Sequence, residues 1–170
     1  PAYNASATIV RCLDGIYTLG LSEQEFEVIC IDDCSKDNTI EVIEQYAKQH
    51  TNLTLLCQAE NHRQGAARNT GIRHAKGNYC IFVDADDTLP QYDVIKQLMY
   101  MQNNDIGLLL GKANIIASNG TVSVWGNSPT QESAIMRGPE IFIDEKNDWV
   151  VYTADGMPSA QWEIQVLVTN

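Results

Sequence analysis

An apolar run that ends in three carboxylates is the part of this sequence best suited to chemistry. Residues 79–83 read Tyr-Cys-Ile-Phe-Val, and Asp84, Asp86 and Asp87 follow them. The β-branched and aromatic residues predict a buried strand, which ends before Pro90. Carboxylates in an Asp-x-Asp spacing can share one divalent cation, and a partly hydrated cation can also reach substrate phosphates. The run therefore predicts a metal-bridged phosphate site, with a solvated acidic loop as the alternative.

Composition limits the classes of protein and partner. The 170 residues are enough for one domain or most of one. The net charge of −11 argues against nucleic acid as the main partner, because a phosphate backbone would be repelled. No run approaches the roughly 20 apolar residues of a membrane span. The five cysteines indicate small core residues in a reducing compartment, with a zinc site at Cys30 and Cys34 as the alternative.

Strands and helices alternate in the region before these carboxylates. The pattern predicts a first helix that Asn4 or Ser6 caps, that has apolar positions from Ile9 to Tyr17 and that Gly20 ends. It then predicts a strand over 26–31, a helix over about 40–50, a strand over 53–57 and a helix over about 64–76. Repeated strand–helix–strand units predict an α/β fold, a three-layer α/β/α sandwich with a mainly parallel, Rossmann-like sheet. Parallel strands end at one edge of the sheet, so Asp32-Asp33 and the Asp84–Asp87 segment should meet at a single crevice.

The pattern is weaker after Pro90. It predicts a helix marked by Tyr92, Ile95, Leu98 and Met99, strand residues at 107–111 and 113–117 that turn at Asn119-Gly120 into 121–125, a short helical turn at 139–143 and a last strand over 161–168. No role is assigned between Asn127 and Ser159.

Four segments in a fixed order resemble a known family. They are Pro1-Ala2-Tyr3-Asn4, then Asp32-Asp33-Cys34-Ser35-Lys36-Asp37-Asn38-Thr39, then Asn61, Gly65, Arg68, Asn69 and Gly71, and finally Val83-Asp84-Ala85-Asp86-Asp87. Together they look like the nucleotide-sugar half of family 2 glycosyltransferases of the GT-A fold. The resemblance covers about the first 90 residues. It implies a nucleotide-sugar-binding α/β part over residues 1–90 and the start of an acceptor-side part, itself incomplete, over 91–170.

The resemblance implies inverting transfer of a sugar from a nucleoside diphosphate donor, usually a uridine one, with Mn²⁺ or Mg²⁺ on the diphosphate. The residues that it assigns to donor binding are Pro1, Ala2, Tyr3, Asp33, Arg68, Asp84 and Ala85, and Asp86 is the metal ligand. Asp33 would accept a hydrogen bond from the base, Arg68 would lie near the base or phosphates, and Asp84 near the ribose and metal. A divalent ion suits this chemistry because it stabilises the charge of the leaving diphosphate.

The resemblance also implies partners and a location. The acceptor would be a glycan or a lipid-linked molecule, and the product a cell-surface polysaccharide or related glycan. A cytoplasmic location follows, and peripheral association with the inner face of the membrane stays open. Which sugar is moved, and onto which acceptor, is not assigned.

The sequence departs from the family pattern in two places. The family has a strand before the Pro-Ala-Tyr-Asn segment, and without it a central strand of the sheet would lack a neighbour. An inverting transfer also needs a carboxylate that takes the proton of the acceptor hydroxyl. The family's acidic pair has no counterpart before Asn170, and neither Asp155 nor Glu163 lies in a matching motif. The catalytic residues are therefore left unassigned, and binding is expected to survive better than catalysis.

Structural alternatives stay open for several of these residues. Asp33 could cap the helix that starts near Asn38. Arg68 could pair with a nearby acid. His62 and His74 are interpreted as surface residues, because no partner stands at a metal-ligand spacing.

Two other functional classes also stay open. Residues 81–89 resemble the first motif of haloacid-dehalogenase-like phosphatases, in which Asp84 would be the nucleophile and Asp86 the acid/base. That family needs a later lysine, and Lys96, Lys112 and Lys146 lie in no matching context. The second alternative is a non-catalytic nucleotide-binding fragment.

Overall fold

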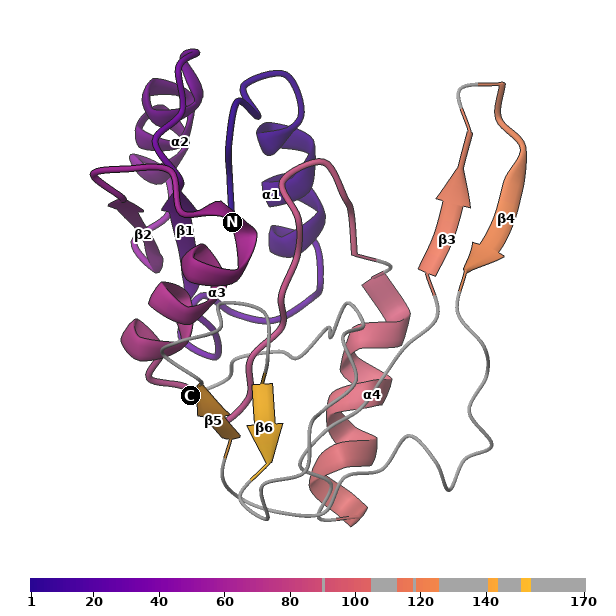
Figure 1. Ribbon diagram of the computed structural model, residues 1–170. Helices are drawn as coiled ribbons and strands as arrows, with labels where there is room; N and C mark the ends of the chain where they lie inside the picture. The colour runs from indigo at the N-terminus through magenta and orange to yellow at the C-terminus, as the bar shows by residue number, and fades with distance from the viewer. Residues whose placement is uncertain (90, 105–112, 118, 126–140, 144–150, 154–170) are drawn as a thin grey trace.

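The computed structural model describes residues 1–89, 91–104, 113–117, 119–125, 141–143 and 151–153 (Figure 1). The elements in chain order are α1 (Ile9–Tyr17), β1 (Val28–Asp32), α2 (Thr39–Ala47), β2 (Leu53–Cys57), α3 (Arg63–His74), α4 (Gln91–Asn104), β3 (Ala113–Ile116), β4 (Val122–Trp125), β5 (Ile141–Ile143) and β6 (Val151–Thr153). The order of the first five elements is the one that the sequence predicted.

Strands β1 and β2 form a parallel pair. The register runs from Val28 opposite Leu53 to Asp32 opposite Cys57. Helix α2 connects the two strands. A parallel pair needs such a crossover, because the chain must return to the start of the first strand before the second strand can run in the same direction. The predicted β–α–β unit is therefore confirmed, and Asp33 follows β1 at its carboxyl end.

Helices cover both faces of β1. Cys30 lies in the main apolar core with Ile9 of α1 and Ile43 of α2. Ile31 points to the opposite face, since successive side chains alternate along a strand. There α3 packs closely enough that a Cβ on Gly71 would lie 3.8 Å from Cγ1 of Ile31. The result is a helix–sheet–helix arrangement, with the carboxyl end of β1 left open between the layers.

Residues 79–83 are not a strand, so that prediction was wrong. They pair with no strand in the described part of the chain. Residues 80–83, together with residues 27–31, line an apolar cavity of about 130 Å³. The edge of β1 away from β2 is bridged by Ala2, whose N–H donates to the carbonyl of Ile31 at 2.8 Å. An apolar run forms a strand only where a neighbouring strand supplies ladder hydrogen bonds, and none of the described strands does so for residues 79–83.

The hairpin of β3 and β4 agrees with the sequence. The two strands are antiparallel, with Ala113 opposite Trp125 and Ile116 opposite Val122. Gly120 has φ +82°, a conformation that glycine adopts without steric cost, so the predicted turn is confirmed.

Strands β5 and β6 form a second antiparallel pair. The predicted helical turn at 139–143 was wrong where the structure describes it, because 141–143 are β5. The expected strands at 107–111 and 161–168, together with Asp155 and Glu163, lie outside the described residues, and the division at residue 90 stays a prediction. None of the helices described in Figure 1 combines the length and apolarity needed to cross a membrane.

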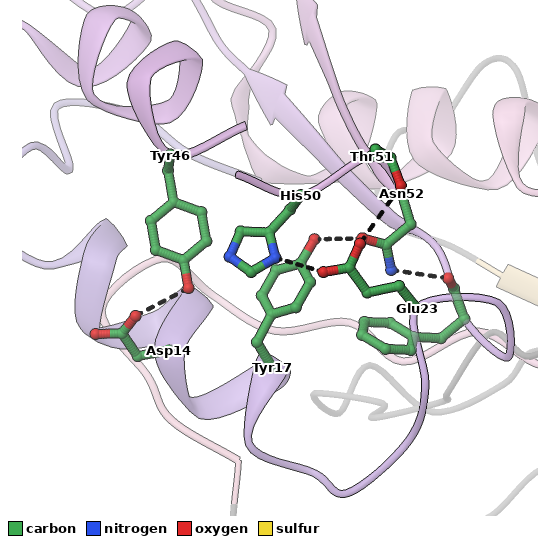
Figure 2. A network of polar contacts seen from close by, with 8 residues as sticks. Asp14, Tyr17, Glu23, Tyr46, His50, Thr51 and Asn52 are labelled. Atoms are coloured by element: carbon green, nitrogen blue, oxygen red, sulfur yellow. Dashed lines mark hydrogen bonds and ion pairs between the residues drawn. The ribbon is translucent and has the colours of Figure 1, made fainter. Parts of the chain in front are cut away.

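Four rings gather where β1 and β2 begin, at the end of the strands opposite to Asp33. We call Tyr17, Phe26, Tyr46 and His50 the aromatic cluster. The His50 ring stacks on Tyr17 with centroids 3.7 Å apart and on Tyr46 at 4.8 Å (Figure 2). The ring of Phe26 lies 5.4 Å from Tyr17. These contacts join α1, α2 and the segment before β1 at one end of the fold.

Candidate functional site

A cleft of about 580 Å³ opens at the carboxyl end of β1. We call it the acidic cleft. Its lining residues are Pro1, Ala2, Tyr3, Asn4, Ala5, Thr8, Asp33, Asn61, Arg63, Gln64, Asp84, Ala85 and Asp86. The carboxyl edge of a parallel sheet is the usual ligand site of α/β proteins, because loops from several units meet there.

The structure brings together seven of the eight residues that the sequence assigned to the site. Asp33 and Asp86 are far apart in the chain, yet both line the acidic cleft. Arg68 does not line the cleft and instead faces the apolar cavity beside β1. The predicted juxtaposition of the two acidic segments is therefore observed, while the role of each side chain stays a prediction.

Asp33 is held in place by the residues before α3. Only 3% of Asp33 is exposed, and its Oδ1 accepts a hydrogen bond from the backbone N–H of His62 at 2.8 Å. The alternative that Asp33 caps α2 was wrong, because the N–H of Thr39 donates to Asp37 instead. No described residue donates to Oδ2 of Asp33. A carboxylate oxygen that lines a cleft and has no donor in the protein is suited to accept a hydrogen bond from a ligand.

Arg68 forms an ion pair with Asp84. Its Nη2 donates to Oδ1 at 2.8 Å, and 23% and 17% of the two side chains are exposed. The structural alternative for Arg68, a pairing with a nearby acid, is therefore what the structure shows. Within the described residues, Nε of Arg68 is buried without a partner. The ion pair orients Asp84 at the cleft and leaves its second oxygen uncommitted.

Helix α1 holds the backbone of the acidic loop. Nη2 of Arg11 donates to the carbonyl of Asp86 at 2.6 Å, and the N–H of Asp87 donates to the carbonyl of Asp84 at 2.9 Å. Burial raises the pKa of Asp87, and the charges of Asp86 and Asp84 add to the effect. Asp86 is exposed, and its carboxylate forms no hydrogen bond or ion pair with the described residues. The loop is thus fixed through its backbone while the Asp86 carboxylate stays available.

The carboxylates fit a hard divalent cation that is bound together with phosphates. Among the described residues, no three histidine, cysteine or acidic side chains converge as a complete metal site. Mg²⁺ in phosphate-handling proteins is usually held by one or two carboxylates plus the substrate, so Asp84 and Asp86 are a sufficient protein contribution. For the zinc alternative at Cys30 and Cys34, the described residues offer no third histidine, cysteine or acidic ligand.

Several cleft residues were not identified from the sequence. They are Asn4, Ala5, Thr8, Asn61, Arg63 and Gln64. Asn4 and Asn61 belong to the motifs that carry the resemblance, so the signal was present but unused. Asn4 ties the first segment to the loop after β1, since its Oδ1 accepts the N–H of Lys36 at 2.8 Å. Arg63 was visible only as one basic residue in an acidic sequence.

Comparisons with known proteins agree on one family. The family described as Glycosyl transferase family 2 matches residues 1–157. The chain is 32% identical over 121 residues to a poly(ribitol-phosphate) beta-glucosyltransferase of Bacillus spizizenii, which covers 71% of this chain and 19% of that protein. It is 30% identical over 166 residues to the uncharacterized glycosyltransferase YibD of Escherichia coli, covering 95% of this chain and 44% of YibD.

Solved structures give the same result. The crystal structure of Staphylococcus aureus TarS 1–349 in complex with UDP superposes with a TM-score of 0.60 and 29% identity, over 65% of this chain and 32% of TarS. The mannosyltransferase PcManGT of Pyrobaculum calidifontis, in complex with GDP-Man and Mn²⁺, has a TM-score of 0.60 and 29% identity, over 64% of this chain and 32% of that one. The chain thus spans less than half the length of each of these four proteins.

Proposed function

The chain belongs to glycosyl transferase family 2 and has a GT-A type α/β fold, and from this premise we propose that the acidic cleft binds a nucleoside diphosphate sugar for transfer to an acceptor hydroxyl. The proposed transfer inverts the anomeric centre and depends on a divalent cation. The proposed donor nucleotide is UDP. TarS was crystallised with UDP and PcManGT with GDP-Man and Mn²⁺, which supports a nucleotide sugar and a metal as ligands of this fold.

One observation carries the proposal. Asp33 and Asp86 line the same cleft, and no described residue donates a hydrogen bond to Oδ2 of Asp33 or to the carboxylate of Asp86. The two ends of a nucleotide sugar require different partners, a hydrogen-bond acceptor for the base and a ligand set for the diphosphate. Asp33, fixed and nearly buried, suits the first requirement. Asp86, exposed on a loop that Arg11 anchors, suits the second.

The residues of this chain would bind and orient the donor. Asp33 accepts an N–H of the base, Ala2 and Ala85 leave room for the nucleotide, and Asp84 is oriented by Arg68 at 2.8 Å. Asp86, with Asp84, holds the divalent cation, Mn²⁺ or Mg²⁺. When bound, such a cation supplies Lewis-acid stabilisation of the charge that develops on the leaving diphosphate.

The acceptor side is proposed more generally. The acceptor hydroxyl attacks the anomeric carbon while the bond from that carbon to the diphosphate oxygen breaks. A carboxylate takes the hydroxyl proton, and none of the described residues is assigned to this step. The proposed acceptor is a glycan or a lipid-linked molecule, and the proposed location is the cytoplasm or the inner face of the membrane.

Nucleotide binding with and without Mn²⁺ tests this function. Thermal shift and isothermal titration of UDP, GDP and ADP should be carried out on the 170-residue chain and on Asp86→Ala. We expect UDP to raise Tm only when Mn²⁺ is present. Asp86→Ala should weaken UDP binding by roughly 100-fold, because the ion loses its carboxylate ligand and the phosphates then lose the ion. Asp86 is exposed, so the variant should keep its Tm without ligand.

Two results would contradict the proposal. One is binding of UDP that is equal with and without Mn²⁺ and equal in Asp86→Ala. The other is a covalent beryllium fluoride adduct at Asp84, which would favour the phosphatase alternative. Family membership and the engagement of Asp84 by Arg68 both argue against that alternative.

A further inference from the structure

Arg63 has an unfavourable backbone conformation at the mouth of the acidic cleft. Its φ is +68°, in the left-handed region that residues with a Cβ rarely adopt. The other described non-glycine residues with positive φ are Asn4 and Cys34. Asn4 also lines the cleft, and Cys34 directly follows Asp33. The three described non-glycine residues with positive φ therefore lie at or next to one site. Asparagine tolerates the conformation well, whereas arginine has no such local compensation.

The sequence offers no local reason for an arginine at this position. Arg63 is the first residue of α3, where a positive charge is unfavourable beside the helix N-terminus. Its N–H donates to Oδ1 of Asn61 at 3.3 Å, which helps to hold the turn, but any residue could supply that N–H. Glycine at this position would adopt the positive φ without steric cost, and it would place no positive charge at the helix N-terminus. A residue kept against two such costs indicates that its side chain is used.

The guanidinium of Arg63 is uncommitted. Among the described side chains that line the acidic cleft, no other one carries a positive charge. The other arginine nearby, Arg68, is already paired with Asp84. Asp33, Asp84 and Asp86 make the cleft strongly negative, so an anionic ligand needs a positive group besides any metal ion. No described acid forms an ion pair with Arg63, which is exposed.

We propose that the Arg63 side chain binds the phosphates of the donor, and that placing an arginine there lowers the stability of its own turn. This inference rests on the proposed function, because it requires nucleotide binding in the acidic cleft. A planar guanidinium can donate two parallel hydrogen bonds to one phosphate, which a lysine ammonium cannot do. Arg63, together with a cation bound at Asp86, would offset the negative charge of the cleft.

Three variants separate charge from strain. Arg63→Gly removes both, Arg63→Asn removes the charge and tolerates the left-handed turn, and Arg63→Lys keeps the charge and the strain. Tm is measured without ligand. Affinity is measured with Mn²⁺ for UDP by titration calorimetry and for uridine, which has no phosphate, by nuclear magnetic resonance titration at millimolar concentration.

Opposite changes in stability and affinity are expected for Arg63→Gly. Its Tm should rise by about 2–4 °C, because the strain is relieved. Its Kd for UDP should rise by roughly tenfold, because a charge-assisted contact is lost, while binding of uridine stays unchanged. Arg63→Asn should match the glycine variant in Kd. Arg63→Lys should recover part of the affinity for UDP without a gain in Tm.

The controls distinguish this inference from the proposed function. Failure of the wild-type chain to bind UDP with Mn²⁺ would overturn both. If the wild type binds and Arg63→Gly binds UDP within a factor of two, only the role of Arg63 is overturned. An equal loss of uridine binding would place the guanidinium against the base and also overturn it. A fall in Tm for Arg63→Gly would show that the arginine stabilises its turn.

Discussion

The two ends of β1 use polar groups in opposite ways. At the amino end, around the aromatic cluster, the polar groups satisfy one another. The hydroxyl of Tyr17 donates to Asn52 Oδ1 at 2.8 Å, and Asn52 Nδ2 donates to the carbonyl of Phe26 at 3.0 Å (Figure 2). His50 contacts Glu23 at 2.7 Å. At the carboxyl end, Asp33 and Asp86 keep free oxygens and the backbone is strained.

This difference separates stability from binding. A polar group that is already paired with its neighbours contributes to the folded state and has little left for a ligand. A carboxylate without a protein partner contributes nothing to folding, yet it is available to a base or a cation. We therefore expect substitutions at the aromatic cluster to change stability alone, and substitutions of the cleft carboxylates Asp33 and Asp86 to change binding alone.

The largest effect on stability is expected for Tyr17→Ala. This ring contacts Phe26, Tyr46 and His50, so its removal leaves a cavity where two helices and β1 meet. The free energy of unfolding should fall by about 2–4 kcal/mol, measured by urea denaturation. Tyr17→Phe is the matched control, since it keeps the ring and loses only the hydrogen bond to Asn52, for about 1 kcal/mol. A loss of UDP affinity in either folded variant would break the proposed separation.

Asp33→Asn should have the next largest effect, on binding. The amide keeps an oxygen for the N–H of His62, so Tm should change little. Affinity for UDP should fall by roughly 10- to 100-fold, because a charged acceptor becomes neutral. Asp14→Asn is the control at the other end of the fold, where Asp14 accepts the hydroxyl of Tyr46 at 2.8 Å. It removes the same charge, and titration calorimetry should find its affinity unchanged.

The smallest effect concerns pH and the aromatic cluster. The hydrogen bond from His50 lowers the pKa of Glu23 from its ordinary value of 4.5. Because the folded pKa lies below the unfolded one, this contact stabilises the fold above about pH 4.5 and is lost as the pH falls through the folded value. The side chain of Glu23 is 37% exposed, so solvent screens the effect.

Glu23→Gln tests this linkage. At pH 6 the variant should melt on the order of 1 °C below the wild type, and the difference should vanish near pH 3. The measurement is Tm by circular dichroism at both pH values. A difference in Tm that grows as the pH falls would have the wrong sign and contradict the assignment.

Local patterns in the sequence were sufficient for most of the regular structure. Strand β2 has the predicted bounds, and α1 and α3 lie within about two residues of theirs. These elements are correct because periodicity and turn residues act over a few neighbours. The run at 79–83 was mispredicted for the same reason. Its composition suits a strand, but a strand also needs a partner, which composition does not specify.

The sequence by itself determined which side chains are available for chemistry. It identified the two acidic segments, their places after apolar runs, and the family that their order resembles. The strand–helix alternation also predicted that these segments meet at one edge of the sheet. Only the tertiary structure decided that Arg68 is committed to Asp84, and that Arg63 is strained and has no ion-pair partner among the described residues. These facts depend on contacts between segments far apart in the chain. Packing around β1 sets such contacts, and no local pattern encodes them.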